Sequence, residues 1–359
     1  MDVTLKKPSE LGQSERQAWC EFVAADPALA SPYFALEFAE CCEEARSDTR
    51  VIIVREKGQI VGFLPLQTGH FGYARPLGGP LGDVHGIVGE PGRAVDLRAW
   101  LRAAHIGVFE FHGALASQSA FRDDTEARDG SWIVDVSDGF EAWRARRRAV
   151  DSKAMRNVDT RYKRLERVEG GHHFVMADTR PQALELMIAW KRDQYRQTGV
   201  FDVFSVAWTR KLLQAVLRRE GERFFGLCST LIINDEIAAV HVGMASDRMS
   251  HFWFPAYNHD YSRMSPGVVL LVETARTAAV MGQHGVELGP GQYAFKKDLS
   301  SYQVGLACGC ATTPSLMGMV CRQSTAFEQA VSKAPLGRVA GWPGKALRKI
   351  DRLAGFYAA

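Results

Sequence analysis

The sequence has neither a long apolar run nor a leader-like N-terminus. No stretch reaches the roughly 18 consecutive apolar residues that a transmembrane helix needs. The first residues, MDVTLKKPSE, lack the apolar core of a secretory signal peptide. We therefore expect a cytoplasmic protein.

Paired cysteines are also lacking. None of the seven cysteines belongs to a C-x-x-C motif, and Cys308 and Cys310 have no histidine near them in the sequence. Zinc and redox sites typically use such pairs, often together with histidine. We therefore expect reduced thiols and no metal site.

A strong charge of one sign is missing as well. The net charge is +3 over 359 residues, so no overall attraction to nucleic acid is indicated, and we expect no DNA partner. With 46% hydrophobic and 24% charged residues, the composition is that of a globular protein. The length is sufficient for two domains.

The order of predicted elements repeats along the chain. Two helices, a strand, a tight turn, a strand, a helix and a strand are predicted at about 12–111 and again at about 181–288. The turns Lys57-Gly58 and Asn234-Asp235 stand at matching places. The simplest interpretation is two copies of one α/β unit, each a mixed sheet flanked by helices.

Two basic segments lie outside this repeat. Residues 138–168 are predicted to form one long polar helix, either a solvated connector or a surface for a polyanionic ligand. Residues 341–357 place Leu347, Ile350 and Leu353 on one helical face, either docked on the body or in weak contact with a membrane surface. We expect domains at 1–136 and 171–315, joined by 137–170 and followed by a helical tail at 316–359.

The stretch from Met249 to Leu299 has the pattern of an anion site. A predicted strand ends near Tyr257, and Ser265-Pro266-Gly267 opens a helix with an N-cap, a proline at the first turn and a small residue. A short strand, Val286–Leu288, then ends at Gly289-Pro290-Gly291. A helix N-terminus between two strands is suited to hold a phosphate or carboxylate.

This order of elements resembles the fold of the GCN5-related N-acetyltransferases (GNAT). That family marks the start of the equivalent helix with R/Q-x-x-G-x-G/A, whose amides bind the pyrophosphate of coenzyme A. The equivalent segment here runs from Met264 through Gly267 to Val269. Met264 stands in the place of the leading base, and Arg263 could supply the charge.

Several short segments resemble a narrower group, the CelD-type acetyltransferases of exopolysaccharide and cellulose loci, which are related to the Fem peptidyltransferases with their two tandem domains. The resemblance covers roughly residues 30–312. It rests on Ser31-Pro32-Tyr33-Phe34, Leu81-Gly82-Asp83-Val84-His85-Gly86, Trp190-Lys191-Arg192-Asp193-Gln194-Tyr195, Ser265-Pro266-Gly267, and Gly289-Pro290-Gly291 with Phe295-Lys296.

The resemblance implies transfer of an acetyl group from acetyl-CoA, as a co-substrate, to an amino-sugar or to a sugar-nucleotide or lipid-linked precursor of a surface polysaccharide. The acceptor is expected to attack the donor directly in a ternary complex. No permanently bound cofactor is implied. The donor is expected in the second domain. Its expected contacts are Tyr257, Arg263, Ser265, Gly267 and Val268.

The reaction needs a base and stabilisation of an oxyanion. Lys296 stands where relatives place a lysine that stabilises negative charge, although it could be a surface lysine. Tyr293 could donate to the leaving thiolate, and Glu287 and His241 are candidate bases. His241 could equally be an interior histidine of its strand.

The acceptor is expected to meet polar residues of both domains. Lys191, Gln194 and Tyr195 share one helix face because they stand at i, i+3 and i+4. Trp253 could line the site or stack on a sugar ring. The full expected set is Asp83, His85, Lys191, Gln194, Tyr195 and Trp253.

Two alternatives stay open. One is Fem-like aminoacyl transfer from aminoacyl-tRNA, in which the basic helix would have a role. The other is a non-catalytic scaffold of a polysaccharide synthase complex, which the replacement at Met264 allows. Contact with the polysaccharide machinery and a peripheral position at the inner face of the membrane are further expectations.

Overall fold

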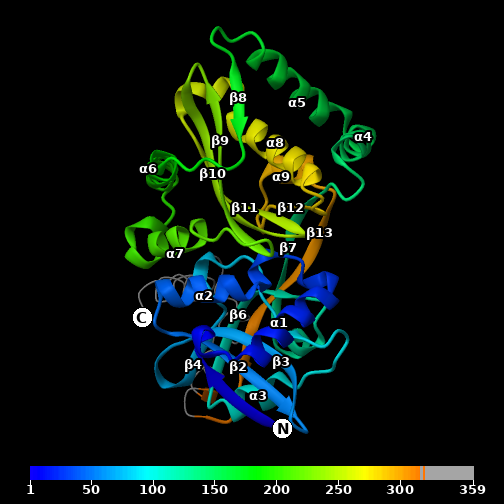
Figure 1. Ribbon diagram of the computed structural model, residues 1–359, viewed down its shortest axis with the longest axis vertical. Helices are drawn as coiled ribbons and strands as arrows, with labels where there is room; N and C mark the ends of the chain where they lie inside the picture. Colours follow the sequence, from blue (N-terminus) through cyan, green and yellow to red (C-terminus); the bar gives the residue numbers. More distant parts are fainter. Residues whose placement is uncertain (316–317, 320–359) are drawn as a thin grey trace, which may run out of the picture. The chain divides into compact units, whose positions relative to one another are not determined.

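The computed structural model describes residues 1–315, 318 and 319 (Figure 1). The chain divides into two compact units. The first contains Met1–Pro27, Cys42–Asp129 and the described residues from Gly305, and the second contains Ala28–Cys41 and Gly130–Val304. These bounds differ from the expected ones, because the segment 28–41 and residues 130–170 all belong to the second unit. The expected helix at 341–357 lies outside the described residues.

The first unit is built on a mixed sheet. Its strands run in the order β1-β2-β3-β4-β6, with β4 and β6 parallel and the other neighbours antiparallel. A core of buried side chains, including Trp100 and Phe109, packs on this sheet. The elements are β1 (Asp2–Lys6), α1 (Gln13–Ala25), β2 (Thr49–Glu56), β3 (Gln59–Thr68), β4 (Tyr73–Arg75), β5 (Val88–Gly89), α3 (Leu97–Ala103) and β6 (Val108–Leu115).

The second unit has its own mixed sheet, in which only β11 and β12 are parallel. Its strand order is β8-β9-β10-β11-β12-β7. The elements are α4 (Phe140–Val150), α5 (Ser152–Leu165), β8 (His172–Val175), α6 (Pro181–Thr198), α7 (Ala207–Leu217), β9 (Phe224–Ile233), β10 (Glu236–Ser246), β11 (Met249–Tyr257), α8 (Pro266–Val280), β12 (Gly285–Glu287) and α9 (Ala294–Leu299). Three further elements, α2 (Leu36–Ala45), β7 (Thr125–Asp135) and β13 (Tyr302–Thr312), have residues in both units.

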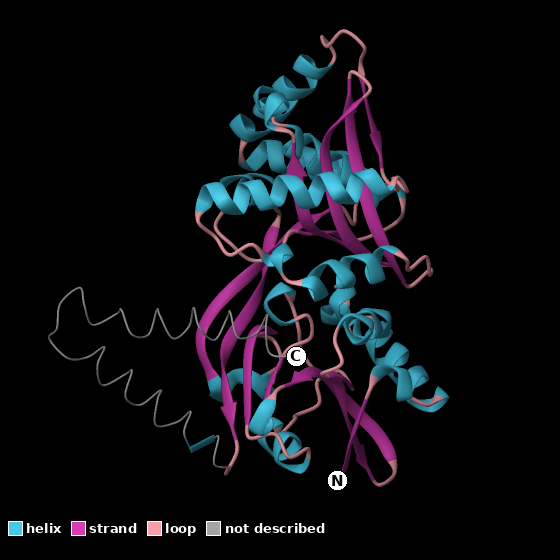
Figure 2. Cartoon of the chain, turned by 90° about the vertical axis from the view of Figure 1, so that its left-hand side faces the viewer, coloured by secondary structure: helices cyan, strands magenta, loops and turns pink. Residues whose placement is uncertain are grey.

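Helices cover both faces of the second sheet. Helices α6 and α7 contact β9 and β10 on one face, and α8 contacts β9 to β12 on the other, with α5 packed against α8. Figure 2 looks at this unit from the side of α6 and α7 and shows helices in front of the strands. Strand β11 is therefore covered on both faces, because α6 contacts it on one face and α8 on the other.

The predicted repeat is confirmed. In chain order, β1, α1, α2, β2, β3, α3 and β6 correspond to β8, α6, α7, β9, β10, α8 and β12. Both hairpin turns have two residues with positive φ, 50° and 82° at Lys57 and Gly58 and 53° and 62° at Asn234 and Asp235. This is the backbone that a two-residue hairpin loop requires. The expected fold class, tandem mixed sheets flanked by helices, is also confirmed.

The single connecting helix predicted for 138–168 is wrong. Asp151 breaks it, with φ −139° and ψ 84°, and its carboxylate caps α5 by accepting from the amide of Ala154 at 2.9 Å. Trp143, Met155 and Leu165 pack into the core of the second unit beside α8. Because these side chains from both helices are buried in that core, α4 and α5 form a layer of the unit and are not a solvated connector.

Among the described residues, no helix combines the length and the apolar character that a membrane crossing requires.

Candidate active site

The parallel strands β11 and β12 separate at one point of the second unit. Their pairing runs from Met249–Gly285 to His251–Glu287 and stops there. Strand β11 continues to Tyr257, whereas the chain after Glu287 turns through Gly289 and Gly291, both with positive φ. His251 and Glu287 are thus the last residue pair before the strands part.

Helix α8 begins beside the continuing strand β11. Ser265 has φ 51°, and its carbonyl accepts from the amides of Val268 and Val269. A Cβ built on Gly267 would lie 3.6 Å from the ring of Tyr257, which is ordinary contact, and Gly267 has no positive φ. The packing and backbone of this chain therefore do not require a glycine there. Arg263 is exposed, and its backbone carbonyl accepts a hydrogen bond from the guanidinium of Arg164 at 3.0 Å.

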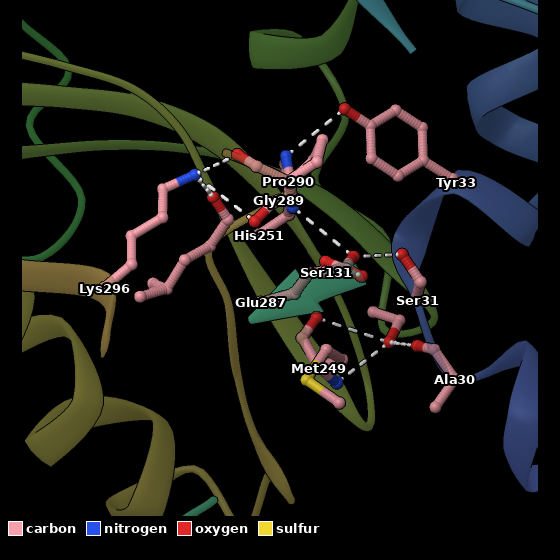
Figure 3. A network of polar contacts seen from close by, with 12 residues as sticks. Ala30, Ser31, Tyr33, Ser131, Met249, His251, Glu287, Gly289, Pro290 and Lys296 are labelled. Atoms are coloured by element: carbon pink, nitrogen blue, oxygen red, sulfur yellow. Dashed lines mark hydrogen bonds and ion pairs between the residues drawn. The ribbon is translucent and has the colours of Figure 1, made fainter. Parts of the chain in front are cut away.

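Lys296 is buried and not a surface lysine, with 8% of its area exposed. Its ammonium donates to the carbonyls of Leu288 at 2.6 Å, Gly289 at 3.2 Å and Pro290 at 2.6 Å (Figure 3). Trp132 holds the same loop, because its indole donates to the carbonyl of Gly291 at 2.8 Å. Three acceptors for three ammonium protons make Lys296 a support of the loop after β12. Direct contact of Lys296 with a developing negative charge stays a prediction.

Two other predicted residues, Tyr293 and Lys191, interact with Lys296. The exposed ring of Tyr293 lies with its centroid 5.6 Å from the Lys296 ammonium. On α6, Lys191 donates to Gln194 at 3.0 Å. Burial, and then the charge of Lys296, lowers the pKa of Lys191 to about 8. Burial also raises the pKa of Tyr195, so its hydroxyl stays protonated.

We expect Lys191→Met to stabilise the protein at neutral pH. Folding lowers the pKa of Lys191 from 10.5 to about 8, so the protonated amine is penalised in the folded state. Below pH 8 both the folded and the unfolded protein carry the proton, so the penalty is complete. Between pH 8 and 10.5 only the unfolded chain keeps the proton, and the penalty falls as the pH rises. Above pH 10.5 neither state is protonated and the penalty is absent. The variant should gain on the order of 1–2 kcal/mol in unfolding free energy at pH 7. Urea denaturation at pH 7 and pH 10 measures this, with Lys211→Met, an exposed lysine of α7, as the control. A gain that is the same at both pH values would contradict the assignment.

A buried chain of polar side chains runs from the segment 28–41 to the end of β12. The hydroxyl of Tyr33 lies 3.2 Å from Nε2 of His251, and Nδ1 of that ring lies 3.3 Å from Oε2 of Glu287 (Figure 3). Ser31 donates to Oε2 at 2.5 Å, and Ser131 donates to Oε1 at 2.9 Å. All five side chains are at least nine-tenths buried. We call Tyr33, His251 and Glu287 the buried triad.

The surroundings of the triad keep its carboxyl group ionised. Burial alone would raise the pKa of Glu287, but His251 and the hydroxyls of Ser31 and Ser131 together bring the pKa below its ordinary value. The half-buried Trp253 packs with its ring centroid 6.0 Å from that of Tyr33 and 6.3 Å from that of His251. Trp253 is therefore part of the aromatic packing around the triad.

His241 lies beside the triad but outside its chain of side-chain contacts. It is fully buried, stacks on Phe252 at a centroid distance of 4.3 Å, and its Nε2 lies 3.2 Å from the backbone carbonyl of His251. Burial lowers the pKa of His241 to about 3, so its imidazole is neutral. A base role for His241 stays a prediction.

Asp83 and His85, expected to bind the acceptor, belong to the first unit. His85 is buried among the rings of Phe109 and Phe121, with 7% of its area exposed. Burial, and then the neighbouring His112, lowers the pKa of His85 to about 3. Contact of the acceptor with His85 and with the half-buried Asp83 stays a prediction.

Sequence reasoning named Glu287 but missed its partners. Tyr33 and His251 are 218 residues apart in the chain, and Ser31 and Glu287 are 256 apart. One weak local signal pointed to His251: it stands two residues before Trp253 on one strand, so the two side chains share a face of the sheet. No group of three or more His, Cys, Asp or Glu side chains within the described part of the chain could hold a metal ion.

Part of this region is similar to a known protein family. Residues 152–297 match the family described as "Acetyltransferase (GNAT) domain". This segment, which is less than half of the chain, is similar to a GNAT domain. It contains β11, β12, α8 and Lys296, and the match supports acyl transfer as the class of reaction, with acetyl-CoA as the co-substrate of such domains. The matched residues do not include Ser31 and Tyr33, which belong to the segment 28–41 of the second unit.

Solved structures agree with this fold. The chain is similar to FemX, with 10% identity and a TM-score of 0.57, over 90% of this chain and 99% of FemX. It is also similar to the C-terminal domain of a protein assigned as a lysylphosphatidylglycerol synthetase from Agrobacterium fabrum, with 12% identity and a TM-score of 0.51, over 87% of this chain and 95% of that domain. At this identity the likeness concerns the fold. Comparison with curated proteins gives no match.

Proposed function

We propose that the second unit transfers an acetyl group from acetyl-CoA to the amine or hydroxyl of an amino-sugar or lipid-linked sugar precursor. The match of residues 152–297 to the GNAT domain supports the donor, and the resemblance to the CelD-type group supports the acceptor. The observation that carries the proposal is the separation of β11 and β12 after His251 and Glu287, beside the start of α8. A thioester placed between these strands would meet the loop that Lys296 holds.

The first unit differs from the second at the position that would correspond to the donor site. Its parallel pair, β4 and β6, starts at Tyr73–Val108, but the following loop returns to β6 in a parallel bridge between His85 and Ala114. The amide of His85 donates to the carbonyl of Gly113, and that of Leu115 donates to the carbonyl of His85. The chain itself therefore occupies the edge of β6 that would correspond to the donor position. We assign the donor to the second unit alone.

Gly267 provides the sharpest test of the donor site. In a helix, alanine is more stable than glycine by about 1 kcal/mol, and the Cβ of Gly267→Ala has room in this chain. We expect the variant to melt at the same or a higher temperature, but to bind acetyl-CoA at least about tenfold more weakly because the Cβ blocks close approach of the pyrophosphate to the helix. Isothermal titration with acetyl-CoA measures the affinity, and Gly282→Ala, beyond the other end of α8, is the control for binding. Unchanged affinity in Gly267→Ala would contradict the placement of the donor.

Aminoacyl transfer from aminoacyl-tRNA is the second candidate. Lys153, Lys163 and Arg167 are exposed on or just after α5, which suits a polyanion. Other bases of this layer are engaged within the protein, since Arg144 and Arg148 both pair with Asp159. A fluorescence titration compares acetyl-CoA with aminoacyl-tRNA. Tight, salt-dependent tRNA binding without acetyl-CoA binding would favour this candidate over acetyl transfer.

A further inference from the structure

The buried triad has the chemical order hydroxyl, imidazole, carboxylate. Tyr33 contacts Nε2 of His251, and Glu287 lies at Nδ1 of the same ring. The carboxylate can only accept, so its proximity favours a proton on Nδ1. Nε2 is then the basic nitrogen, and the proton between it and the Tyr33 oxygen can reside on either atom. A Ser-His-Asp triad uses the same order, with serine in the place of this tyrosine.

Both ends of the triad are fixed by the fold. Ser31 and Ser131 hold the two oxygens of Glu287, and the ring of Tyr33 packs edge-on against Phe38 at a centroid distance of 5.0 Å. Ser246 also holds this segment, because its hydroxyl donates to the carbonyl of Ala30 at 2.8 Å. A proton relay needs such fixed donors and acceptors, since each transfer requires hydrogen-bond distance.

The triad lies where the proposed reaction takes place. His251 and Glu287 are the last pair of β11 and β12 before the strands separate, and the loop held by Lys296 follows Glu287 directly. Trp253, two residues further along β11, is the partly exposed member of the aromatic packing around Tyr33. An acceptor that stacks on Trp253 would therefore approach the triad from the side of Tyr33.

We propose that Tyr33, His251 and Glu287 form the proton relay of the acyl-transfer site. As the acceptor amine or hydroxyl attacks the thioester carbonyl, its proton passes to the Tyr33 oxygen while the Tyr33 proton passes to Nε2 of His251. The new bond to the acyl carbon forms, the carbon–sulfur bond breaks, and the thiolate takes a proton back from the relay. Glu287 is a positioning residue that stabilises the imidazolium. This role rests on the proposed acyl transfer.

Other charged groups near the triad define what a titration will report. His241 approaches the His251 backbone, and its own pKa is lowered mainly by burial. Tyr302 of β13 has its pKa raised by burial, and then by Asp135 and Glu287. Neither supplies a second proton acceptor to Nε2. We expect Tyr33 and Glu287, which approach the two ring nitrogens, to influence the titration of the His251 imidazole.

The first experiment needs no acceptor. Protein labelled with ¹⁵N-histidine gives the tautomer and the titration of His251, whose signals His251→Gln identifies. We expect a proton on Nδ1 and a titrating Nε2, with signals that shift in Tyr33→Phe. A proton fixed on Nε2, or a titration that Tyr33→Phe leaves unchanged, would overturn the relay. If Tyr33→Phe does not fold, the tautomer of the wild-type protein still decides.

The second experiment measures consumption of acetyl-CoA with glucosamine, or with water, as the acceptor. Tyr33→Phe and His251→Gln should lower kcat by about 10²–10⁴-fold, change KM little and remove the acidic limb of the pH profile, which reports protonation of the base. Tyr162→Phe is the matched control, because its hydroxyl donates to Glu273 elsewhere in the second unit. Turnover in Tyr33→Phe with the wild-type pH profile would overturn the relay. Absence of acetyl-CoA binding in the wild-type protein would instead contradict the proposed function, and the histidine titration would still decide the relay.

Discussion

Lys296→Met should abolish most of the acyl-transfer activity and destabilise the protein by about 2–4 kcal/mol. The substitution keeps the length of the side chain but removes an ammonium that donates to the carbonyls of Leu288, Gly289 and Pro290. Buried acceptors without a donor cost more free energy than the original bonds contributed. The amide of Trp132 still donates to Gly289, so the loop should be displaced chiefly at Leu288 and Pro290.

The effects of Lys296→Met on affinity and on turnover distinguish two roles for Lys296, support of the loop and stabilisation of the oxyanion. If it only supported the loop, acetyl-CoA affinity and turnover would fall together, because both depend on the position of that loop. If it also stabilised the oxyanion, kcat would fall far more than affinity, as expected for an interaction made only in the transition state. The contacts of Lys296 lead us to expect a common loss.

The matched control is Lys297→Met, which removes the exposed neighbour on the same helical turn. Urea denaturation, isothermal titration with acetyl-CoA and turnover with glucosamine should all give nearly wild-type values for it. A second consequence can be measured on Lys191, whose pKa is lowered partly by Lys296. That pKa should move back toward its ordinary value in Lys296→Met. Wild-type stability in Lys296→Met would contradict the buried, triply bonded lysine.

Local chemistry was sufficient to predict most of the second unit. The bounds of α6 and β9 follow from Pro181 and Gly199 at the helix ends and from the turn Asn234-Asp235. These signals involve residues that are neighbours in the sequence, so they can be recognised from the sequence alone. The same reasoning failed at Asp151, where a single capping residue converts one long amphipathic pattern into two helices.

Long-range partners could not be predicted in this way. The segment 28–41 belongs to the second unit because Ser31 and Tyr33 reach residues more than 200 positions away. No local periodicity encodes such a pairing. In the sequence, the motif around Ser31 indicates only a resemblance. Its physical role appears in the folded chain, where the hydroxyls of Ser31 and Tyr33 contact Glu287 and His251. The site residues that sequence can name are therefore those on one continuous stretch.

Glu287→Ala should be the most destabilising single change in the second unit that we consider, at about 3–5 kcal/mol. The carboxylate is 2% exposed and accepts from Ser31 and Ser131, with His251 at 3.3 Å. Its loss leaves these buried donors without their acceptor. Because Ser31 belongs to the segment 28–41, we also expect faster hydrogen exchange there, which loss of a contact elsewhere in the core would not produce.

The pH dependence of this loss follows from the pKa of Glu287. Its folded-state pKa lies below the ordinary value of 4.5, so the stabilisation is fully present above that value and declines as the pH falls toward the folded-state pKa. The difference in unfolding free energy between wild type and Glu287→Ala should therefore shrink as the pH falls below about 4.5. Denaturant unfolding across this range measures it, with Glu236→Ala, an exposed carboxylate that accepts from Tyr261, as the control at less than about 1 kcal/mol. A difference that grew on acidification would mean that Glu287 is protonated in the folded protein, and the imidazole of His251 would then lack the carboxylate that the relay requires.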